Sequence, residues 1–283
     1  MSLNMLVLVK QVPDTQNVTG EAMRPDGTVN RDALPAIFNP EDLHALEEAL
    51  QIKDRLGGVV TALSMGPPKA ADVLKECLYR GADKGILISD RGFAGSDTLA
   101  TSYALTCAIK RLSSVDLILC GRQAIDGDTA QVGPQVAEKL GINQLTCVAD
   151  ILDISRERIV VKRQIENGYE TLAAALPILL TVTSEANEPR SAGAKRVMGF
   201  KRIPCCEDAE GTDCWPCEPI EHIKQWDMQA IAADDERCGF SGSATWVKKI
   251  DNVVLTARET KRIENTDQGV AALITELMEE HII

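Results

Sequence analysis

The chain of 283 residues is poor in aromatic side chains and in long apolar runs. Aromatic residues make up only 4% of it, so a core built from its 45% of apolar residues must be mainly aliphatic. No apolar run approaches the roughly 18–20 residues that a helix needs to cross a bilayer, so we expect no membrane insertion. The N-terminus enters a strand-like run at once, and we therefore expect no signal peptide.

Positive charge and histidine are also scarce. The sequence has 42 acidic residues against 30 basic ones, a net charge of −12, which disfavours nucleic acids and anionic membranes as partners. The three histidines, His44, His222 and His281, are far apart, and no order of Ser, His and Asp or of Cys and His indicates nucleophilic catalysis. We therefore predict no catalytic side chain.

Cysteine is present nine times, but its placement argues against a disulfide framework. Cys77, Cys107, Cys120 and Cys147 lie in or beside aliphatic segments, where a free cysteine behaves as a small hydrophobe. A reducing, cytoplasmic compartment is the natural interpretation. Two close pairs could instead bind zinc or an iron–sulfur cluster or form a redox disulfide, although uncommitted thiols are the simpler alternative. These pairs are Cys205 with Cys206 and Cys214 with Cys217.

Short aliphatic runs alternate with amphipathic ones over the first half of the chain. We expect strands at 5–9, 59–64, 84–89 and 115–120, and helices at 40–56, 69–80, 96–112 and 132–140. This order predicts an α/β fold with a doubly wound, mostly parallel sheet and helices on both faces. The strands are continuously apolar, which fits burial of the sheet on both sides.

The pattern changes after Gly141. Runs at 145–154, 158–164 and 170–173 predict a small antiparallel meander, with Asn167-Gly168 as a hairpin turn, before another strand at 177–183. Residues 204–240 are poor in periodic apolar residues, and such a long segment is usually functional or bound to a partner. The stretch 269–278 predicts a final amphipathic helix.

The most informative stretch runs from Cys120 to Gln135. It joins an apolar strand to a helical stripe through a turn rich in Gly and Asp, and unpaired N–H groups at such a helix start favour a phosphate. The alternative is an ordinary strand–turn–helix junction. Asp128 stands three residues before Gln131, a variant of the capping-box spacing. Asp126 and Asp128 would repel a phosphate, so they must point away, cap the helix or meet ribose hydroxyls.

The same stretch closely resembles the nucleotide-binding segment of electron-transfer flavoprotein beta subunits. Segments 7–14, 39–42, 64–67 and 187–190 resemble other parts of that family, in the same order. The resemblance implies three parts of the chain. Residues 1–185 would form a nucleotide-binding α/β core, 186–240 a recognition loop and a cysteine-containing insertion, and 241–283 an extended C-terminal arm that packs on the alpha subunit.

The resemblance also implies a cofactor site. Asn39 belongs to it, although a helix cap is an equally good interpretation of this residue. The residues implied to contact the cofactor are Leu8, Val9, Asn39, Met65, Thr98, Thr101, Arg122, Asp126, Gly127, Asp128, Thr129, Ala130, Gln131, Val132, Gly133 and Pro134.

The run from Gly95 to Ser102 is similar to that of electron-bifurcating family members, which hold FAD where ordinary members hold AMP. Thr98 and Thr101 lie three residues apart at a helix start and face one way, so their hydroxyls could reach the flavin ring. The simpler alternative is a polar first turn capped by Ser96. Arg122 would be an electrostatic partner of reduced flavin, or else part of a surface ion pair.

The implied function is electron transfer. With an alpha subunit, the chain would accept electrons from NADH on its FAD and bifurcate them to ferredoxin or flavodoxin and, through the alpha-subunit FAD, to an acyl-CoA dehydrogenase-type enzyme. A non-bifurcating carrier with structural AMP is the second interpretation. A stand-alone nucleotide-binding module of the universal-stress type is the third, and the last 100 residues argue against it.

The implied docking residues depart from the family pattern at one position. Ala194 stands where many members place a leucine that enters a pocket of the partner dehydrogenase, and Val197 or Met198 could take its place because Met suits adaptable contacts. The implied docking set is Asn187, Glu188, Pro189, Arg190, Ala194, Val197 and Met198.

Overall fold

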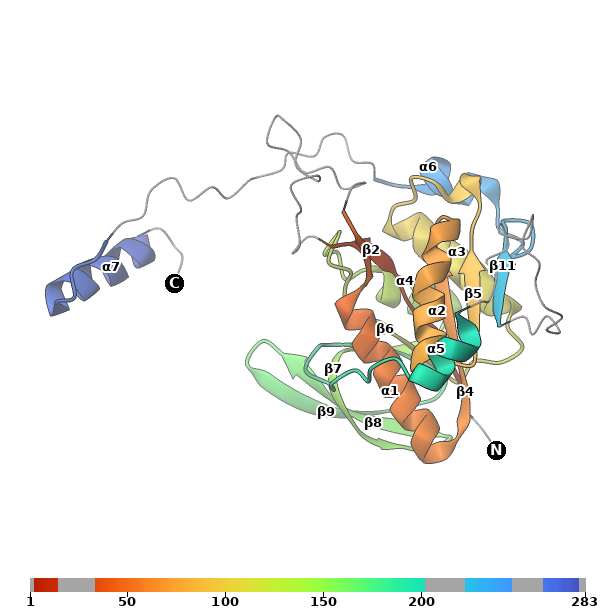
Figure 1. Cartoon of the computed structure of the whole chain (residues 1–283), viewed down its shortest axis with the longest axis horizontal. Helices are drawn as coiled ribbons and strands as arrows, with labels where there is room; N and C mark the ends of the chain where they lie inside the picture. The colour runs from red at the N-terminus through yellow and green to blue at the C-terminus, as the bar shows by residue number, and fades with distance from the viewer. Residues whose placement is uncertain (1–2, 15–33, 202–221, 246–261, 280–283) are drawn as a thin grey trace.

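The computed structural model describes residues 3–14, 34–201, 222–245 and 262–279 of the chain (Figure 1). Its main strands are β1 (Leu3–Leu8), β4 (Gly58–Met65), β5 (Lys84–Ile88), β6 (Leu117–Gly121), β7 (Asn143–Ile154), β8 (Arg158–Ile165), β9 (Gly168–Ala175), β10 (Ile178–Val182) and β11 (Ile223–Trp226). They form one nine-stranded sheet in the order β11-β5-β4-β1-β6-β10-β7-β8-β9. A separate antiparallel pair joins β2 (Gln11–Pro13) to β3 (Ala36–Phe38).

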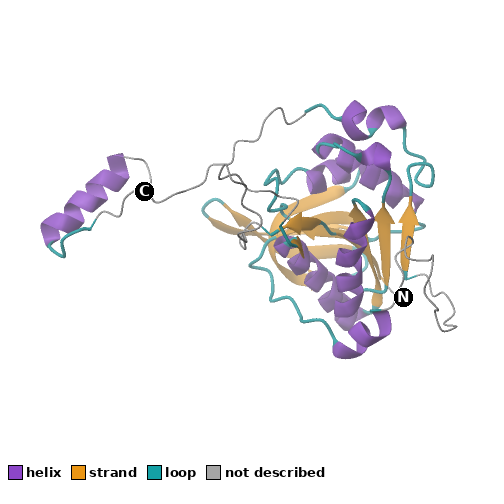
Figure 2. Ribbon diagram, turned by 45° about the horizontal axis from the view of Figure 1, so that its top comes forward, coloured by secondary structure: helices purple, strands orange, loops and turns teal. Residues whose placement is uncertain are grey.

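Helices cover both faces of the sheet, as predicted (Figure 2). Helices α1 (Pro40–Leu56) and α2 (Ala71–Arg80) lie on one face, and α3 (Thr98–Arg111) and α4 (Val132–Leu140) on the other. Strand β1 shows why the core has two halves: Met5 and Val7 join the cluster under α1 and α2, whereas Leu6 and Leu8 join the cluster under α3 and α4. Alternate side chains of a strand point to opposite faces, so a strand buried on both sides must be apolar throughout.

The order of the strands reverses at β1. The chain runs from β1 through α1 to β4 and through α2 to β5, and α3 then carries it to β6 on the other side of β1. All of these neighbouring strands are parallel. The carboxyl ends of β1, β4 and β6 therefore meet at a topological switch point, where doubly wound sheets bind their ligands.

The meander continues this sheet. Strands β7, β8 and β9 pair antiparallel, as predicted, and β7 also pairs parallel with β10. The hairpin lies one residue earlier than Asn167-Gly168: Glu166 and Asn167 form the turn, and Gly168 is already the first residue of β9. The hairpin signal thus located the turn but not its register.

A ninth strand comes from the segment with little apolar periodicity. The sequence predicted no strand within 204–240, but β11 pairs parallel with β5 at the edge of the sheet. Met228, Ile231 and Cys238 follow it into the core cluster beside α3. Four residues are too few to show a period, so only the pairing with a distant strand reveals β11. The short helices η5 (Asp235–Arg237) and α6 (Gly239–Gly242) complete this segment.

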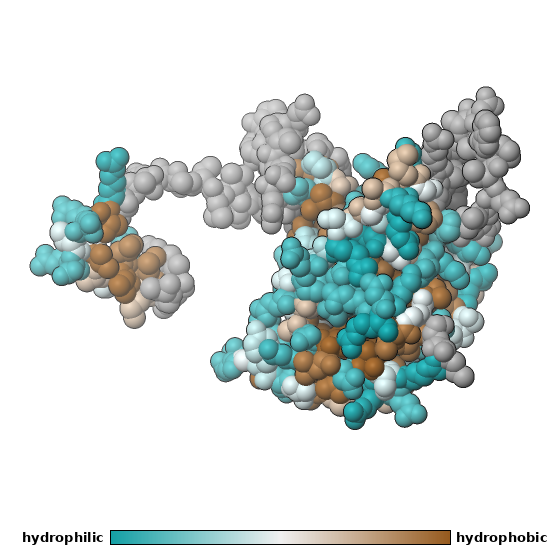
Figure 3. Space-filling model, turned by 60° about the horizontal axis from the view of Figure 1, so that its bottom comes forward, coloured by the Kyte–Doolittle hydropathy of each residue, from teal (hydrophilic) through white to brown (hydrophobic). Residues whose placement is uncertain are grey.

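The remaining described helices are η3 (Pro68–Ala70), η4 (Arg91–Phe93), α5 (Ala194–Phe200) and α7 (Asp267–Glu279). The predicted final helix is confirmed as α7. Its apolar atoms gather on one side, and the side chains of Val270, Ile274 and Met278 are about half exposed (Figure 3). No helix within the described ranges is long and apolar enough to cross a membrane.

Candidate functional site

A cavity of about 420 Å³ opens at the carboxyl ends of β1, β4 and β6. This volume lies in the range of roughly 300–1,000 Å³ that is usual for small-molecule sites. The structure brings nearly all the cofactor residues suggested by the sequence to its wall; Asn39 and Pro134 do not line it. The wall contains Leu8, Val9, Met65, Thr98, Thr101, Arg122 and residues 126–133.

The turn between β6 and α4 forms the base of the cavity. Asp128 and Ala130 have φ values of 47° and 52°, a left-handed conformation that non-glycine residues rarely adopt and that often marks functional sites. Helix α4 begins without a side-chain cap, and the carboxylate of Asp128 instead accepts a hydrogen bond of 3.0 Å from Gln123. Of the roles considered for Asp128, capping of α4 is therefore not seen. The first N–H groups of α4 have no partner within the helix.

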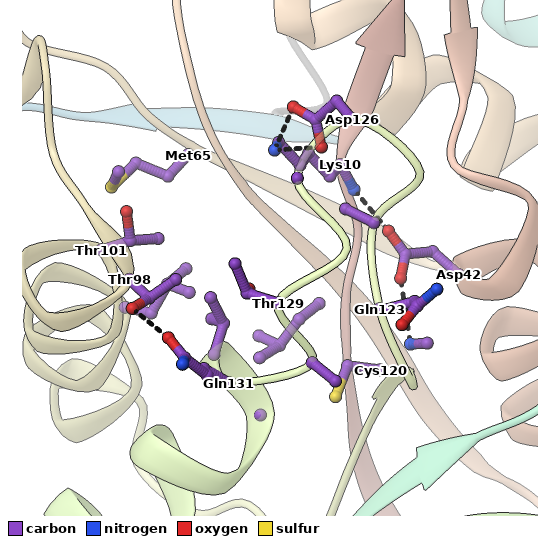
Figure 4. Close-up of a pocket in the computed structure, with 18 of the residues that line it drawn as sticks. Lys10, Asp42, Met65, Thr98, Thr101, Cys120, Gln123, Asp126, Thr129 and Gln131 are labelled. Atoms are coloured by element: carbon purple, nitrogen blue, oxygen red, sulfur yellow. Dashed lines mark hydrogen bonds and ion pairs between the residues drawn. The ribbon is translucent and has the colours of Figure 1, made fainter. Parts of the chain in front are cut away.

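The charge of Asp126 is balanced by Lys10. The Nζ of Lys10 lies 2.6 Å from Oδ2 of Asp126, and the pair sits on the cavity wall (Figure 4). Lys10 belongs to the family-like segment 7–14 but not to the cofactor residues that the resemblance implies. Because the two residues are 116 positions apart, no local pattern reveals their pairing.

Asp42 joins the two loops that flank the cavity. Its carboxylate accepts hydrogen bonds of 2.9 Å from the backbone N–H of Lys10 and of Gly121, at the ends of β1 and β6. Burial raises the pKa of Asp42 to about 7, although these hydrogen bonds act in the opposite direction. Asp42 also lines the cavity, and sequence reasoning missed it as a site residue. The sequence feature that could have indicated Asp42 is its place in the first turn of α1.

Asn39 is completely buried behind the same loop. It occupies the N-cap position of α1, but its side chain makes no capping hydrogen bond. Its amide instead donates to the carbonyl of Gln123 at 2.9 Å and accepts from the N–H of Ile125 at 3.2 Å. Asn39 thus holds the backbone of the loop after β6.

The start of α3 forms the opposite wall. Asp97 caps this helix through hydrogen bonds from the N–H groups of Leu99 and Ala100, whereas the hydroxyl of Ser96 donates to the carbonyl of Phe93. In the alternative interpretation Ser96 capped this turn, whereas the cap is the next residue, Asp97. Thr98 and Thr101 both line the cavity. The hydroxyl of Thr98 donates to Oε1 of Gln131 at 2.8 Å and so links α3 to the turn before α4 (Figure 4).

Arg122 forms an ion pair, one of the two roles considered for it, and its role toward a flavin stays a prediction. Its Nη2 forms an ion pair of 2.8 Å with Glu41, and the side chain also lines the cavity. Its Nε is buried and has no hydrogen-bond partner among the described residues. A buried donor without a partner is costly.

The docking residues fall into two groups. Asn187 and Arg190 are held on α1: the amide of Asn187 donates to Glu48 at 2.8 Å, and the guanidinium of Arg190 forms two hydrogen bonds, of 2.8 and 3.0 Å, with Glu47. The others lie on or near the surface, with Glu188 and Pro189 in the loop and Ala194, Val197 and Met198 on α5. Met198 has 64% of its surface exposed.

The cysteines divide between described and undescribed parts of the chain. Cys77, Cys107, Cys120, Cys147 and Cys238 are free thiols in the structure. The possible metal ligands Cys205, Cys206, Cys214 and Cys217 lie outside the described residues.

The strand order and the cavity at its switch point define a doubly wound α/β protein of the class that binds nucleotides at this position. The family model named Electron transfer flavoprotein domain matches residues 26–204. The chain is 48% identical over 286 residues to "Electron transfer flavoprotein subunit beta" of Thermoanaerobacterium thermosaccharolyticum, covering 99% of this chain and 100% of that protein.

Two further relatives carry names of reductase complexes. The chain is 40% identical over 283 residues to "Caffeyl-CoA reductase-Etf complex subunit CarD" of Acetobacterium woodii. It is also 40% identical over 293 residues to "Acryloyl-CoA reductase electron transfer subunit gamma" of Anaerotignum propionicum. Each comparison covers 99% of this chain and 100% of the relative. The chain belongs to the beta-subunit family of electron transfer flavoproteins.

Proposed function

We propose that this beta subunit holds FAD in the cavity and, with an alpha subunit, bifurcates electrons from NADH. One electron goes to ferredoxin or flavodoxin, and the other goes through the alpha-subunit FAD to an acyl-CoA dehydrogenase-type enzyme. The observation that carries the proposal is that Thr98 and Thr101 line the same cavity as the turn 126–133.

The extent of the cavity supports a ligand longer than a mononucleotide. The turn before α4 is suited to phosphate, because helix N-termini favour anions. The cavity continues from this turn to the start of α3, where Met65, Phe93 and Leu105 add apolar wall beside the two threonines. AMP has no need of this second wall, whereas a flavin ring requires apolar surface with a few hydroxyl groups at its edge.

The chain's own residues fit FAD in charge as well as in shape. Lys10 balances Asp126, so a phosphate beside the turn meets less negative charge. The positive charge of Arg122, whose side chain lines the cavity, can stabilise negative charge that develops on the ring. FAD supplies the hydride and single-electron chemistry, and the protein supplies orientation and electrostatics.

The assembly follows from surfaces that this chain leaves exposed. The apolar side of α7 supports packing of the arm 241–283 on the alpha subunit, and exposed Met198 on α5 is the best candidate to replace the leucine missing at Ala194. The names of the relatives from Acetobacterium woodii and Anaerotignum propionicum support an acyl-CoA reductase or dehydrogenase as the next partner. The free thiols support a reducing, cytoplasmic location.

Counting nucleotides tests the proposal. The heterodimer is purified, denatured in acid, and its released nucleotides are separated and quantified. We expect two FAD and no AMP per heterodimer. One FAD with one AMP would indicate the non-bifurcating carrier instead, and a protein without any nucleotide would contradict both.

A further inference from the structure

The segment Cys238–Thr245, which we call the clasp, lies along the turn that opens α3. The backbone N–H of Asp97 donates to the hydroxyl of Ser243 at 2.8 Å, and that hydroxyl donates in turn to the carbonyl of Gly239 at 2.7 Å. The N–H of Gly239 donates to the hydroxyl of Ser96 at 3.1 Å. Two of these hydrogen bonds, from Asp97 to Ser243 and from Gly239 to Ser96, tie the two segments together, although the segments are more than 140 residues apart.

The carboxylate of Asp97 serves both segments. Its Oδ1 accepts from the N–H groups of Leu99 and Ala100 and so caps α3. Its Oδ2 accepts from the backbone N–H of Thr245 at 2.9 Å and from the hydroxyl of Thr245 at 3.0 Å. Partial burial acts to raise the pKa of Asp97, but the hydrogen bonds outweigh it and the net pKa is lowered. The group is therefore ionised at neutral pH.

Close packing fixes the clasp at two glycines. A Cβ at Gly95 would lie 2.3 Å from the ring of Phe240, so the ring is seated directly on this backbone. Gly239 has a φ of 57°, and a Cβ there would lie 2.3 Å from the carbonyl oxygen of Gly92. Phe240 keeps 70% of its surface exposed despite this contact. The position of the clasp is thus defined by backbone contact as well as by hydrogen bonds.

The clasp touches the cavity wall on one side and leads to the arm on the other. Gly95, Ser96, Asp97 and Thr98 all line the cavity. Residues 241–245 of the clasp are also the first residues of the arm 241–283, which contains α7. We propose that Asp97 is a positioning residue through which the clasp couples the C-terminal arm to the nucleotide cavity. This inference rests on the proposed nucleotide site. Because coupling is reciprocal, a ligand that orders the start of α3 strengthens the clasp, and displacement of the arm weakens ligand binding.

Hydrogen exchange in the purified heterodimer tests the coupling. Exchange of the backbone amides at 243–245 is measured with FAD bound and after its removal. We expect removal to speed exchange by about 2- to 10-fold in the unmodified protein, the range for loss of one hydrogen bond. In Asp97→Asn we expect no such dependence, because the amide oxygen still caps α3 while its NH2 group cannot accept from Thr245.

Flavin release provides the second measurement. Asp97→Asn should release FAD about 2- to 10-fold faster and shift the visible absorption bands of the bound flavin. Protection of the amides of Leu99 and Ala100 should remain, which a simple loss of helix structure would not allow. Thr245→Val removes only the hydroxyl donor and should give a smaller effect in the same direction. Ser241→Ala, an exposed serine on α6, is the matched control and should behave as the unmodified protein.

The outcomes separate this inference from the proposed function. If FAD binds but exchange at 243–245 is the same with and without it, the coupling is wrong and the function stands. The same holds if Asp97→Asn and Thr245→Val both release FAD at the unmodified rate. If the unmodified heterodimer binds no nucleotide, the proposed function fails, and this inference fails with it.

Discussion

The Nζ of Lys10 lies 2.6 Å from Oδ2 of Asp126, so an ion pair joins the loop after β1 to the turn before α4 at the cavity. The side chain of Lys10 is 49% exposed and that of Asp126 is 24% exposed. Exposed pairs of this kind contribute only about 0–1 kcal/mol to stability. The role of the pair is therefore electrostatic: it removes an unbalanced negative charge from a site that we expect to receive phosphate.

Replacing Lys10 tests this role. Lys10→Met should weaken FAD binding by roughly 5-fold or more, because one unit-charge repulsion at about 4 Å costs about 1 kcal/mol even in water. Thermal stability should change little. The double variant Lys10→Met with Asp126→Asn should recover most of the affinity, as measured by flavin fluorescence. A double variant as weak as Lys10→Met alone would indicate that Lys10 contacts the ligand directly.

The hydroxyls at the start of α3 are the second target. Replacing Thr98 and Thr101 together by Val keeps their shape and removes one or two hydrogen bonds, which costs about 1–3 kcal/mol and should weaken FAD retention by roughly 5- to 150-fold. The alpha-subunit flavin should be unaffected. NADH oxidation should fall, while electron acceptance from an artificial donor survives.

Thr171→Val is the matched control for that pair, because Thr171 is an exposed threonine on β9. It should leave flavin content and activity unchanged. Full flavin content and full NADH activity in the double threonine variant would show that the ligand is not held by α3.

The free energy of unfolding should depend on pH through the protonation of Asp42. Its pKa is raised to about 7 in the folded chain from 3.8, so the folded state binds more protons than the unfolded state between these values. This contribution to stability is fully present below about pH 4 and is lost as the pH rises toward 7. Asp42→Asn cannot titrate, so its stability relative to the unmodified protein should improve steadily from pH 5 to pH 7.

Urea unfolding of both proteins across this pH range measures the difference. The two curves should run parallel above about pH 8, where Asp42 is ionised in both states. A constant difference between them from pH 5 to pH 8 would contradict the raised pKa of Asp42.

The apolar side of α7 should be required for assembly. Replacing Val270, Ile274 and Met278 by Ser removes three apolar side chains that this chain leaves about half exposed. Full burial of one such side chain is worth about 1.5–3 kcal/mol, so the triple variant should no longer co-purify with the alpha subunit. Its far-ultraviolet circular dichroism and the melting of the core should be preserved.

The control replaces Gln268, Ala272 and Thr275, on the opposite side of the same helix, by Ser. It should still co-purify. Unchanged assembly of the apolar variant would mean that α7 does not contact the alpha subunit.

The sequence by itself determined the layers of this protein. Continuous aliphatic strands between amphipathic helices can be buried only in a sheet covered on both faces, and the fold has this form. The Gly- and Asp-containing run after β6 likewise placed the turn that lines the cavity. These features are local, because periodicity and turn residues report directly on which side of a segment is buried.

Tertiary structure decided which distant groups meet. The side chain of Asn39, a possible cap of α1, instead supports the loop after β6. Asp97 caps α3 in place of Ser96, the alternative that the sequence offered, and also binds Thr245. Strand β11 forms because its backbone pairs with the edge strand β5. A polar side chain satisfies its hydrogen bonds with whichever groups the fold places nearby. Local sequence shows that such a side chain needs a partner, and the packing of remote segments selects it.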